Sequence, residues 1–159
     1  METKNKILPL EEALPVIDSW KEQGSKVVFT NGCFDILHIG HVDYLEKARN
    51  TGDKLIIGLN TDLSVRILKG AGRPVNDEIS RGRLLAALSF VDMVILFNED
   101  TPLELISAVK PDILVKGNDY EIKNIVGANF VMENGGKVIT LDLIVGVSTT
   151  SIINKIKNA

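Results

Sequence analysis

Five short apolar runs recur along the chain, and each has the length of a β-strand. Val, Ile and Leu dominate the runs, which cover residues 26–30, 54–60, 93–97, 112–116 and 137–141. Polar residues do not alternate regularly with apolar ones inside them. Because a strand that helices cover on both faces is apolar throughout, this pattern predicts a five-stranded parallel sheet.

Segments with helical spacing separate the apolar runs. They cover residues 40–49, 62–68, 80–90, 102–109 and 126–133, with further helices expected over 10–23 and 149–157. Pro15 interrupts the first of these, which weakens the prediction there. Regular alternation of strands and helices predicts a single doubly wound, Rossmann-like α/β domain with helices on both faces of the sheet. We expect residues 1–25 to form an N-terminal helical extension and residues 26–159 to form this domain.

Composition narrows the possible functions. The 159 residues suffice for one compact domain, and 18 basic against 21 acidic residues give a net charge of −3. That balance argues against a nucleic-acid partner. Apolar runs are too short to cross a membrane, and the first residues lack a signal-peptide pattern. A single cysteine, Cys33, cannot form an internal disulfide, so we expect a reducing, cytoplasmic location.

The loop after the first predicted strand carries the most distinctive chemistry. It contains both histidines of the chain, His38 and His41, with Gly40 between them. Ligands of doubly wound sheets bind at the carboxyl ends of the strands, and a helix N-terminus favours anions. Two imidazoles beside such a terminus can donate hydrogen bonds to phosphate oxygens. We therefore predict a phosphate-binding site here, where Gly40 leaves room for the ligand.

This loop allows two other interpretations, a structural one and a metal-binding one. A single histidine is most often a hydrogen-bonded structural residue, although two in one glycine-bearing loop are harder to explain that way. Cys33, Asp35, His38 and His41 could also be four metal ligands. No second paired cluster completes such a site, so we expect the protein itself to bind no metal ion.

Several motifs resemble a known family. Residues 32–41 resemble the G-x-F-D-x-x-H-x-G-H signature of the HxGH nucleotidyltransferase superfamily, and residues 148–152 resemble its S-T-T-x-I signature. A closer resemblance is to the adenylyltransferase domain of the bacterial heptose enzymes. It extends from about Lys26 to Ile156 and rests on residues 30–35, 68–75, 115–120 and 134–136.

This resemblance implies a reaction. AMP would pass from ATP, supplied with Mg²⁺, to D-glycero-β-D-manno-heptose 1-phosphate, giving ADP-heptose and pyrophosphate for lipopolysaccharide or surface-glycan synthesis. Residues 26–159 would then be a nucleotidyltransferase domain. The partners would be ATP, the sugar 1-phosphate and a separate sugar kinase that supplies it. Family members also lead us to expect a homodimer, with no nucleic-acid or membrane partner.

The resemblance also implies roles for individual residues. The catalytic set is His38, His41 and Lys69. Nucleotide-binding residues would be Gly32, Cys33, Phe34, Gly40, Lys116, Gly117, Asp119, Ser148, Thr149 and Thr150. Substrate-binding residues would be Asn31, Asp35, Arg73 and Arg81.

Plainer explanations exist for some of these residues. Lys69 could belong to a solvated basic loop, Arg81 could be a surface charge, and Ser148 is a good helix N-cap. Arg83 matches no motif, so we expect it to be exposed to solvent.

Two alternative functions stay open. One is a cytidylyltransferase that uses CTP and glycerol 3-phosphate or another polyol phosphate; the other is a non-catalytic nucleotide-binding module. The apolar residues 143–145 stand where the glycerol-phosphate relatives carry a basic residue, which weakens the first alternative. Heptose enzymes often carry an acidic residue there, so the exact sugar stays open. A tRNA synthetase fragment is disfavoured by length and charge.

Overall fold

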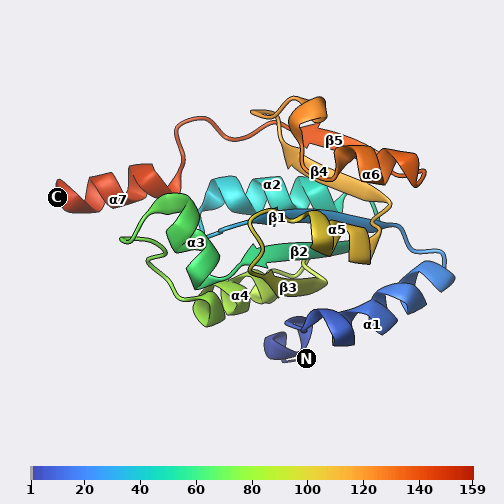
Figure 1. Ribbon diagram of the computed structural model, residues 1–159. Coiled ribbons are helices and arrows are strands. Elements are labelled where there is room, and N and C mark those ends of the chain that lie inside the picture. Colours follow the sequence, from blue (N-terminus) through green and yellow to red (C-terminus); the bar gives the residue numbers. More distant parts are fainter. Residues whose placement is uncertain (1) are drawn as a thin grey trace.

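The computed structural model describes residues 2–159 and contains one five-stranded sheet (Figure 1). Its strands are β1 Val27–Gly32, β2 Lys54–Asn60, β3 Met93–Phe97, β4 Ile113–Gly117 and β5 Lys137–Leu141. All neighbouring strands pair in parallel, in the order β3-β2-β1-β4-β5. The predicted sheet is confirmed. The main difference is that β1 continues to Gly32, two residues beyond the predicted end.

Seven α-helices surround the sheet over the described residues. They are α1 Leu10–Glu22, α2 Ile39–Arg49, α3 Asp62–Lys69, α4 Glu78–Ala87, α5 Leu103–Val109, α6 Ala128–Glu133 and α7 Thr149–Lys157. Each predicted helix is present. Two short 3₁₀ helices, Thr3–Lys6 and Ile122–Asn124, were not predicted.

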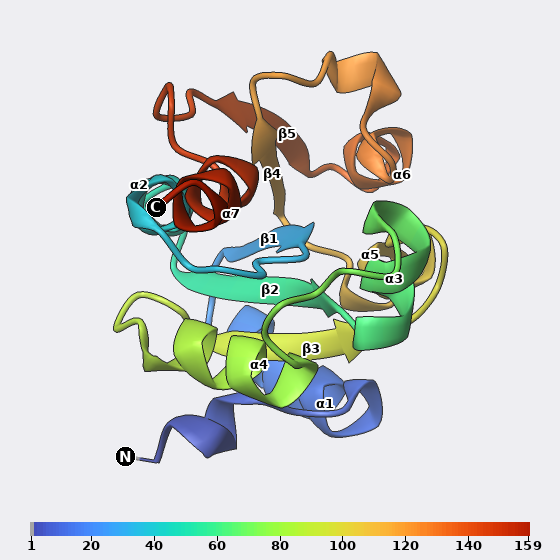
Figure 2. The ribbon, with the colours of Figure 1, turned by 90° about the vertical axis from the view of Figure 1, so that its left-hand side faces the viewer.

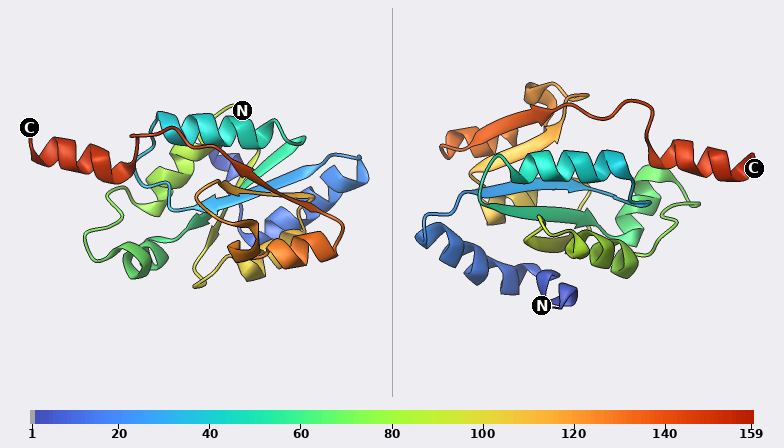
Figure 3. Two further views of the ribbon diagram at one scale, coloured as in Figure 1. Left: turned by 90° about the horizontal axis from the view of Figure 1, so that it is seen from above. Right: turned by 180° about the vertical axis from the view of Figure 1, so that it is seen from behind.

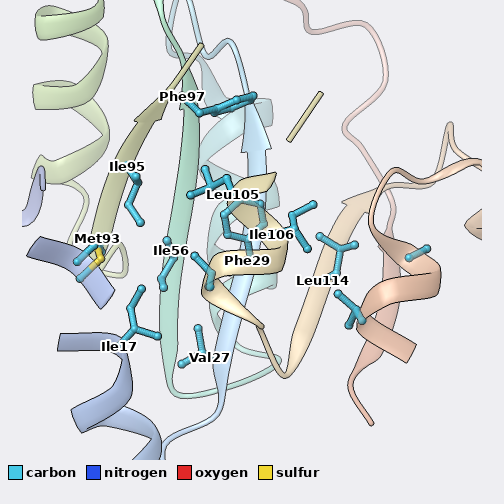
Figure 4. Packing of buried hydrophobic residues seen from close by; sticks show 14 of the residues in the cluster. Ile17, Val27, Phe29, Ile56, Met93, Ile95, Phe97, Leu105, Ile106 and Leu114 are labelled. Carbon is cyan, nitrogen blue, oxygen red and sulfur yellow. The ribbon is translucent and has the colours of Figure 1, made fainter. Parts of the chain in front are cut away.

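Two hydrophobic clusters show that helices cover both faces of the sheet. Residues of α1, α5 and α6 pack in one cluster with Val27 and Phe29 of β1 (Figure 4). Residues of α2 and α4 pack in the other cluster with Val28. Successive β1 side chains thus point to opposite faces, and both faces are buried. The predicted doubly wound α/β architecture is confirmed, and Figures 2 and 3 show its helical layers from other sides.

The N-terminal segment packs against this sheet. Pro15 lies inside α1 but is exposed, so the Glu11 carbonyl that loses its helical partner can bind water. Ala13 and Ile17, on the opposite side, join the core cluster of β1. Ile7 forms an isolated parallel bridge with Val94 of the edge strand β3. The division of the chain at residue 25 stays a prediction.

The strand order creates a switch point between β1 and β4. The chain winds from β1 through β2 to β3 and then returns to the other side of β1 to form β4 and β5. The crossover direction therefore reverses where β1 and β4 end, at Gly32 and Gly117. In such folds the ligand binds in the crevice beyond these two ends. Among the helices described, none has the length and apolar character needed to cross a membrane.

The last helix leaves the body of the domain. In Figures 1 and 3, α7 projects beyond the sheet from the end where β1 terminates, and none of its residues is fully buried. A capping box fixes its start: the Ser148 hydroxyl accepts a hydrogen bond from the Ser151 amide, and the Ser151 hydroxyl accepts one from the Ser148 amide.

Candidate active site

A cavity of about 450 Å³ lies at the switch point between β1 and β4. It is closed by the start of α2 on one side and by the segment that leads into α7 on the other. Most of the predicted site residues line it: Asn31, Gly32, Cys33, Phe34, His38, Gly40, His41, Lys69, Lys116, Gly117, Asp119, Ser148 and Thr149. The imidazoles of the first loop and the hydroxyls of the last helix therefore share one cavity.

The two histidines form a stacked pair. Their ring centroids lie 3.8 Å apart, with an angle of 21° between the ring planes. Gly40 makes this possible, because a Cβ atom there would come within 3.0 Å of the His38 ring. We predicted that Gly40 leaves room for the ligand. The structure adds that it leaves room for the His38 imidazole.

Phe34 supports the pair from the side. Its ring meets the His41 ring edge-on, with centroids 5.2 Å apart and planes at 65°. The Phe34 backbone has φ of 43°, in the left-handed region that residues with side chains seldom adopt. Such conformations concentrate where a binding site requires them. Here the turn after β1 brings an aromatic ring against a histidine of the site.

The histidines are neutral near pH 7. Burial lowers the pKa of His41 to about 4, with a further contribution from His38, and burial also lowers the pKa of His38. The Nδ1 atoms of both rings are buried, and within residues 2–159 neither has a hydrogen-bond partner. Structural histidines are normally satisfied by such partners. The pair is therefore better explained as a ligand-binding surface than as a structural element.

Lys116 supplies a buried cation at the end of β4. Its ammonium group donates hydrogen bonds to the backbone and side-chain oxygens of Asn31 on β1, across the switch point. Burial lowers the pKa of Lys116 to about 8, while the Asp119 carboxylate opposes the shift. At pH 7 the ammonium form predominates. The floor of the cavity thus carries a positive charge that a phosphate can approach.

Gly117 allows the backbone of β4 to form a narrow wall. A Cβ atom at this position would lie 2.6 Å from the Asp119 carboxylate and 3.0 Å from Leu143. A larger residue here would displace the side chain of Asp119 or Leu143.

The start of α7 contacts the histidine loop directly. The Thr149 hydroxyl donates a hydrogen bond to the Ile36 carbonyl at 3.5 Å, which joins the last helix to the loop after β1. Ser148 caps the helix, as its simpler interpretation held. Thr150 was expected at the nucleotide but faces away from this cavity and lines a neighbouring one. Adjacent residues on a helix point about 100° apart, which separates the two threonines.

Asp35, predicted to bind the substrate, does not line this cavity. It is 1% exposed, and its carboxylate accepts hydrogen bonds from Arg73 Nε at 2.6 Å and from the amides of Val75 and Asn76. Burial alone would raise the pKa of Asp35, but the two amides and Arg73 lower it overall. Asp35 therefore anchors the segment between α3 and α4. Arg73 lines the neighbouring cavity.

Arg81 is also placed differently from the prediction. It is fully buried, and its guanidinium donates to the Cys33 carbonyl, the Asn76 carbonyl and the Asp62 carboxylate. It cannot be the surface charge of the simpler interpretation, and it does not line the cavity. The hydrogen bonds of the Arg81 guanidinium instead connect the loop after β1 with α3 and with the segment that precedes α4. Arg83 is exposed, as predicted.

The four-ligand metal interpretation of the first loop is wrong. The Asp35 carboxylate is committed to Arg73 and two backbone amides. Across the part of the chain that the structure describes, no group of three or more His, Cys, Asp or Glu side chains is placed to hold a metal ion.

Several residues at the cavity were not predicted: Tyr44, Tyr120, Leu143, Ile144 and Val147. Tyr44 is buried, lies 2.8 Å from the Thr30 hydroxyl and donates to the Val115 carbonyl at 3.1 Å. Burial raises its pKa to about 12. Its position three residues after His41, on the same side of a helix, was a usable signal. Residues 143 and 144 entered the sequence analysis only in the comparison with the glycerol-phosphate relatives, and the sequence did not predict that they line the cavity.

The paired imidazoles, a buried lysine and a helix start thus line one cavity at the switch point of the doubly wound sheet, where folds of this kind bind their ligands. Residues 29–155 match the cytidylyltransferase-like family, and the chain belongs to this family. The fold and the family together make the chain an α/β nucleotidyltransferase domain.

Named relatives are similar over nearly the whole chain. Bifunctional protein HldE of Methylobacillus flagellatus is 54% identical over 152 residues, which are 96% of this chain and 31% of that protein. Bifunctional protein HldE of Campylobacter jejuni subsp. doylei is 56% identical over 98% of this chain and 32% of its own length. The chain therefore spans about a third of the length of these relatives.

Two solved structures are also similar. A lipopolysaccharide core biosynthesis protein from Thermoplasma volcanium has 32% identity and a TM-score of 0.61, over 76% of this chain and 98% of that one. A pantoate-beta-alanine ligase from Francisella tularensis has a TM-score of 0.65 over 96% of this chain and 78% of that one. Its identity is 16%, so that likeness concerns the fold alone.

Proposed function

We propose that the chain is an adenylyltransferase that transfers AMP from ATP to a sugar 1-phosphate and releases pyrophosphate. The acceptor that fits best is D-glycero-β-D-manno-heptose 1-phosphate, and the product is ADP-heptose. The observation that carries the proposal is the single cavity shared by the His38–His41 pair, Lys116 and the start of α7. These groups are donors and cations, as a polyphosphate ligand requires.

The reaction needs little covalent chemistry from the protein. A phosphate oxygen of the acceptor attacks the α-phosphorus of ATP in line, and pyrophosphate leaves on the opposite side. The second pKa of a phosphate monoester is about 6, so the attacking oxygen needs no general base at pH 7. Catalysis then consists of positioning two anions and stabilising the charge that builds up on the phosphorus oxygens.

The cavity residues suit those tasks. Neutral imidazoles at His38 and His41 each provide an N–H donor, and Lys116, held by Asn31, provides a positive charge in the same cavity. The amides at the start of α7, next to Thr149, face the same space and favour an anion. Lys69, exposed at the end of α3, can reach the phosphates as the two substrates come together.

The choice of sugar rests on the relatives. The motif resemblance to heptose adenylyltransferases agrees with the bifunctional HldE proteins at 52–56% identity. The solved relative from Thermoplasma volcanium is described as a lipopolysaccharide core biosynthesis protein. The product would accordingly serve lipopolysaccharide or surface-glycan assembly. We also propose that Mg²⁺ enters with ATP, that a sugar kinase forms the acceptor and that the enzyme acts in the cytoplasm. A homodimer stays a prediction.

The direct test supplies ATP or CTP with Mg²⁺ and either heptose 1-phosphate or glycerol 3-phosphate, and measures nucleotide-sugar and pyrophosphate. We expect ADP-heptose from ATP and heptose 1-phosphate, at a rate well above every other combination. CTP is the informative comparison, because the family description names cytidylyl transfer. No product with any combination would contradict the proposal and favour a nucleotide-binding module.

A further inference from the structure

A second cavity, of about 430 Å³, lies next to the first. One of its walls is the segment 69–75 between α3 and α4. The other wall is one face of α7, formed by Thr150, Ile153, Asn154 and Lys157. The intervals of three, one and three residues place these four side chains on the same side of the helix. Figures 1 and 3 show the two walls together at one end of the molecule.

The charge of the second cavity is unusual for this protein. Lys69, Arg73 and Lys157 line it, and no acidic side chain does, although the chain as a whole has a net charge of −3. A concave site on an acidic protein whose charged lining residues are all basic attracts a small anion rather than a polyanionic surface. The Asp35 carboxylate, which pairs with Arg73, offsets part of this charge. The cavity also has the volume of a small-molecule site.

The two cavities meet. Lys69 lines both of them, and the neighbouring residues Thr149 and Thr150 line one each. The start of α7 therefore stands between the two spaces. A transfer between two bound anions needs this arrangement, because the attacking oxygen of one must reach the phosphorus of the other within about 3.5 Å.

We propose that the second cavity is the acceptor subsite and that the outward face of α7 recognises the sugar. This assignment rests on the proposed function. Lys69 sits where the acceptor phosphate meets the α-phosphate of the nucleotide. Arg73 binds the acceptor phosphate, while Asn154 and Lys157 contact sugar hydroxyls.

Arg73 is prepared for this role by Asp35. The Asp35 carboxylate holds Arg73 Nε at 2.6 Å, and the side chain of Arg73 keeps 19% of its surface exposed. Among the described residues, only the Nε of its guanidinium donates a hydrogen bond to the protein. The two terminal nitrogens are thus oriented but uncommitted, which is the geometry that suits two phosphate oxygens.

The α7 face suits a polyol. Asn154 offers both a donor and an acceptor, and Lys157 offers donors on a long side chain. Ile153 and Val75 provide apolar surface for the carbon face of a sugar ring. Lys157 lies two helical turns from the start of α7, so an acceptor that contacts both the start of α7 and Lys157 must be longer than glycerol 3-phosphate. The subsite therefore selects for the longer sugar phosphates.

The test uses the double variant Asn154→Ala with Lys157→Gln and the control variant Lys155→Gln. Lys155 is exposed on the same helix and lines neither cavity. We expect the double variant to raise the KM for heptose 1-phosphate about tenfold, the effect of losing two hydrogen bonds to the substrate. The KM for ATP should stay within about twofold, which also reports intact folding. Lys155→Gln should behave as the wild type.

An unchanged KM for the sugar phosphate in the double variant, with the wild type active, would overturn the acceptor subsite but leave the proposed function standing. An equal rise in both KM values would also overturn it. A wild type that forms no product from any sugar phosphate would remove the proposed function, and the subsite with it.

Discussion

The rings of His38 and His41 lie face to face at 3.8 Å, and Gly40, in the first turn of α2, has no side chain to prevent it. Burial keeps both imidazoles neutral, so the stacked rings do not repel each other as cations. The pair can therefore present two N–H donors side by side to one ligand. The stacked arrangement of the two rings is therefore the feature on which phosphate binding by the histidine loop depends.

Gly40→Ala should displace the His38 ring, because the new Cβ atom would lie 3.0 Å from ring atoms. We expect kcat to fall by about 10- to 100-fold, the effect of misplacing a donor in the active site. Alanine is a better helix former than glycine by about 1 kcal/mol, so the thermal midpoint should not fall appreciably. Steady-state kinetics and thermal unfolding measure the two effects separately.

Gly82→Ala is the matched control for this change. Gly82 lies in α4, and a Cβ atom there would make ordinary contacts, the nearest at 3.4 Å to Ile7. Its activity should match that of the wild type. A Gly40→Ala enzyme as active as the Gly82→Ala enzyme would show that the position of the His38 ring is unimportant.

Lys116 should give the pH profile an alkaline limb. Its pKa is lowered to about 8, so the ammonium group loses its proton as the pH rises through this value, and attraction for the triphosphate is lost with it. We expect kcat/KM for ATP to fall above about pH 8. Since bound phosphate favours the charged form, kcat itself should decline only at higher pH.

Lys116→Met should lower kcat/KM at neutral pH and remove this limb. His41 should add no step near pH 6.5, because its pKa lies near 4. A profile for the Lys116→Met enzyme that still falls above about pH 8 would assign the limb to another group.

Asp35→Asn should weaken the segment between α3 and α4. The buried carboxylate is paired with Arg73 and two amides, and breaking such a pair typically costs about 3–5 kcal/mol. The pKa of Asp35 is lowered in the folded state, so its stabilisation is present above the unfolded pKa and is lost as the pH falls through the folded value. Urea unfolding at pH 7 should show the loss.

The stability difference between Asp35→Asn and the wild type should narrow as the pH falls below about 4, because the Asp35 carboxylate of the unfolded chain then gains a proton before that of the folded protein does. Equal stability of the two proteins at pH 7 would contradict the anchoring role of Asp35.

Tyr44→Phe should mainly affect stability. The phenol hydroxyl contacts Thr30 on β1 and donates to Val115 on β4, which fastens α2 to both strands of the switch point. Removing a buried, satisfied hydroxyl costs about 1–2 kcal/mol. We expect a lower urea midpoint with kcat within about fivefold of the wild type. A loss of kcat without a loss of stability would instead place Tyr44 in the chemistry.

The sequence predicted the fold well because its signals are local. The run 54–60 is apolar between Lys54 and Asn60 at its two ends, and the structure places β2 over these same residues. The histidine loop was also recognisable, since its ligand-binding groups lie within a few positions of each other. Ser148 at the start of the last predicted helix gave the capping position directly.

The positions of Asp35 and Arg81 could not be predicted, because they depend on contacts between distant parts of the chain. Asp35 meets Arg73 across 38 positions, and Arg81 meets the Cys33 carbonyl across 48. No periodicity in the sequence reports that a charged side chain will be buried against such a partner. The second cavity is hidden for the same reason, because it exists only where α7 comes beside the segment 69–75.

The proposed function depends most on the paired imidazoles of His38 and His41. The variant His41→Ala tests their role most directly when kcat and the Kd for ATP are measured on the same preparation. We expect kcat to fall by about 100- to 1,000-fold, the typical loss of one transition-state donor, and the Kd for ATP to change by less than about fivefold. A kcat close to that of the wild type, or a loss of ATP affinity as large as the loss of rate, would contradict a catalytic role for the pair.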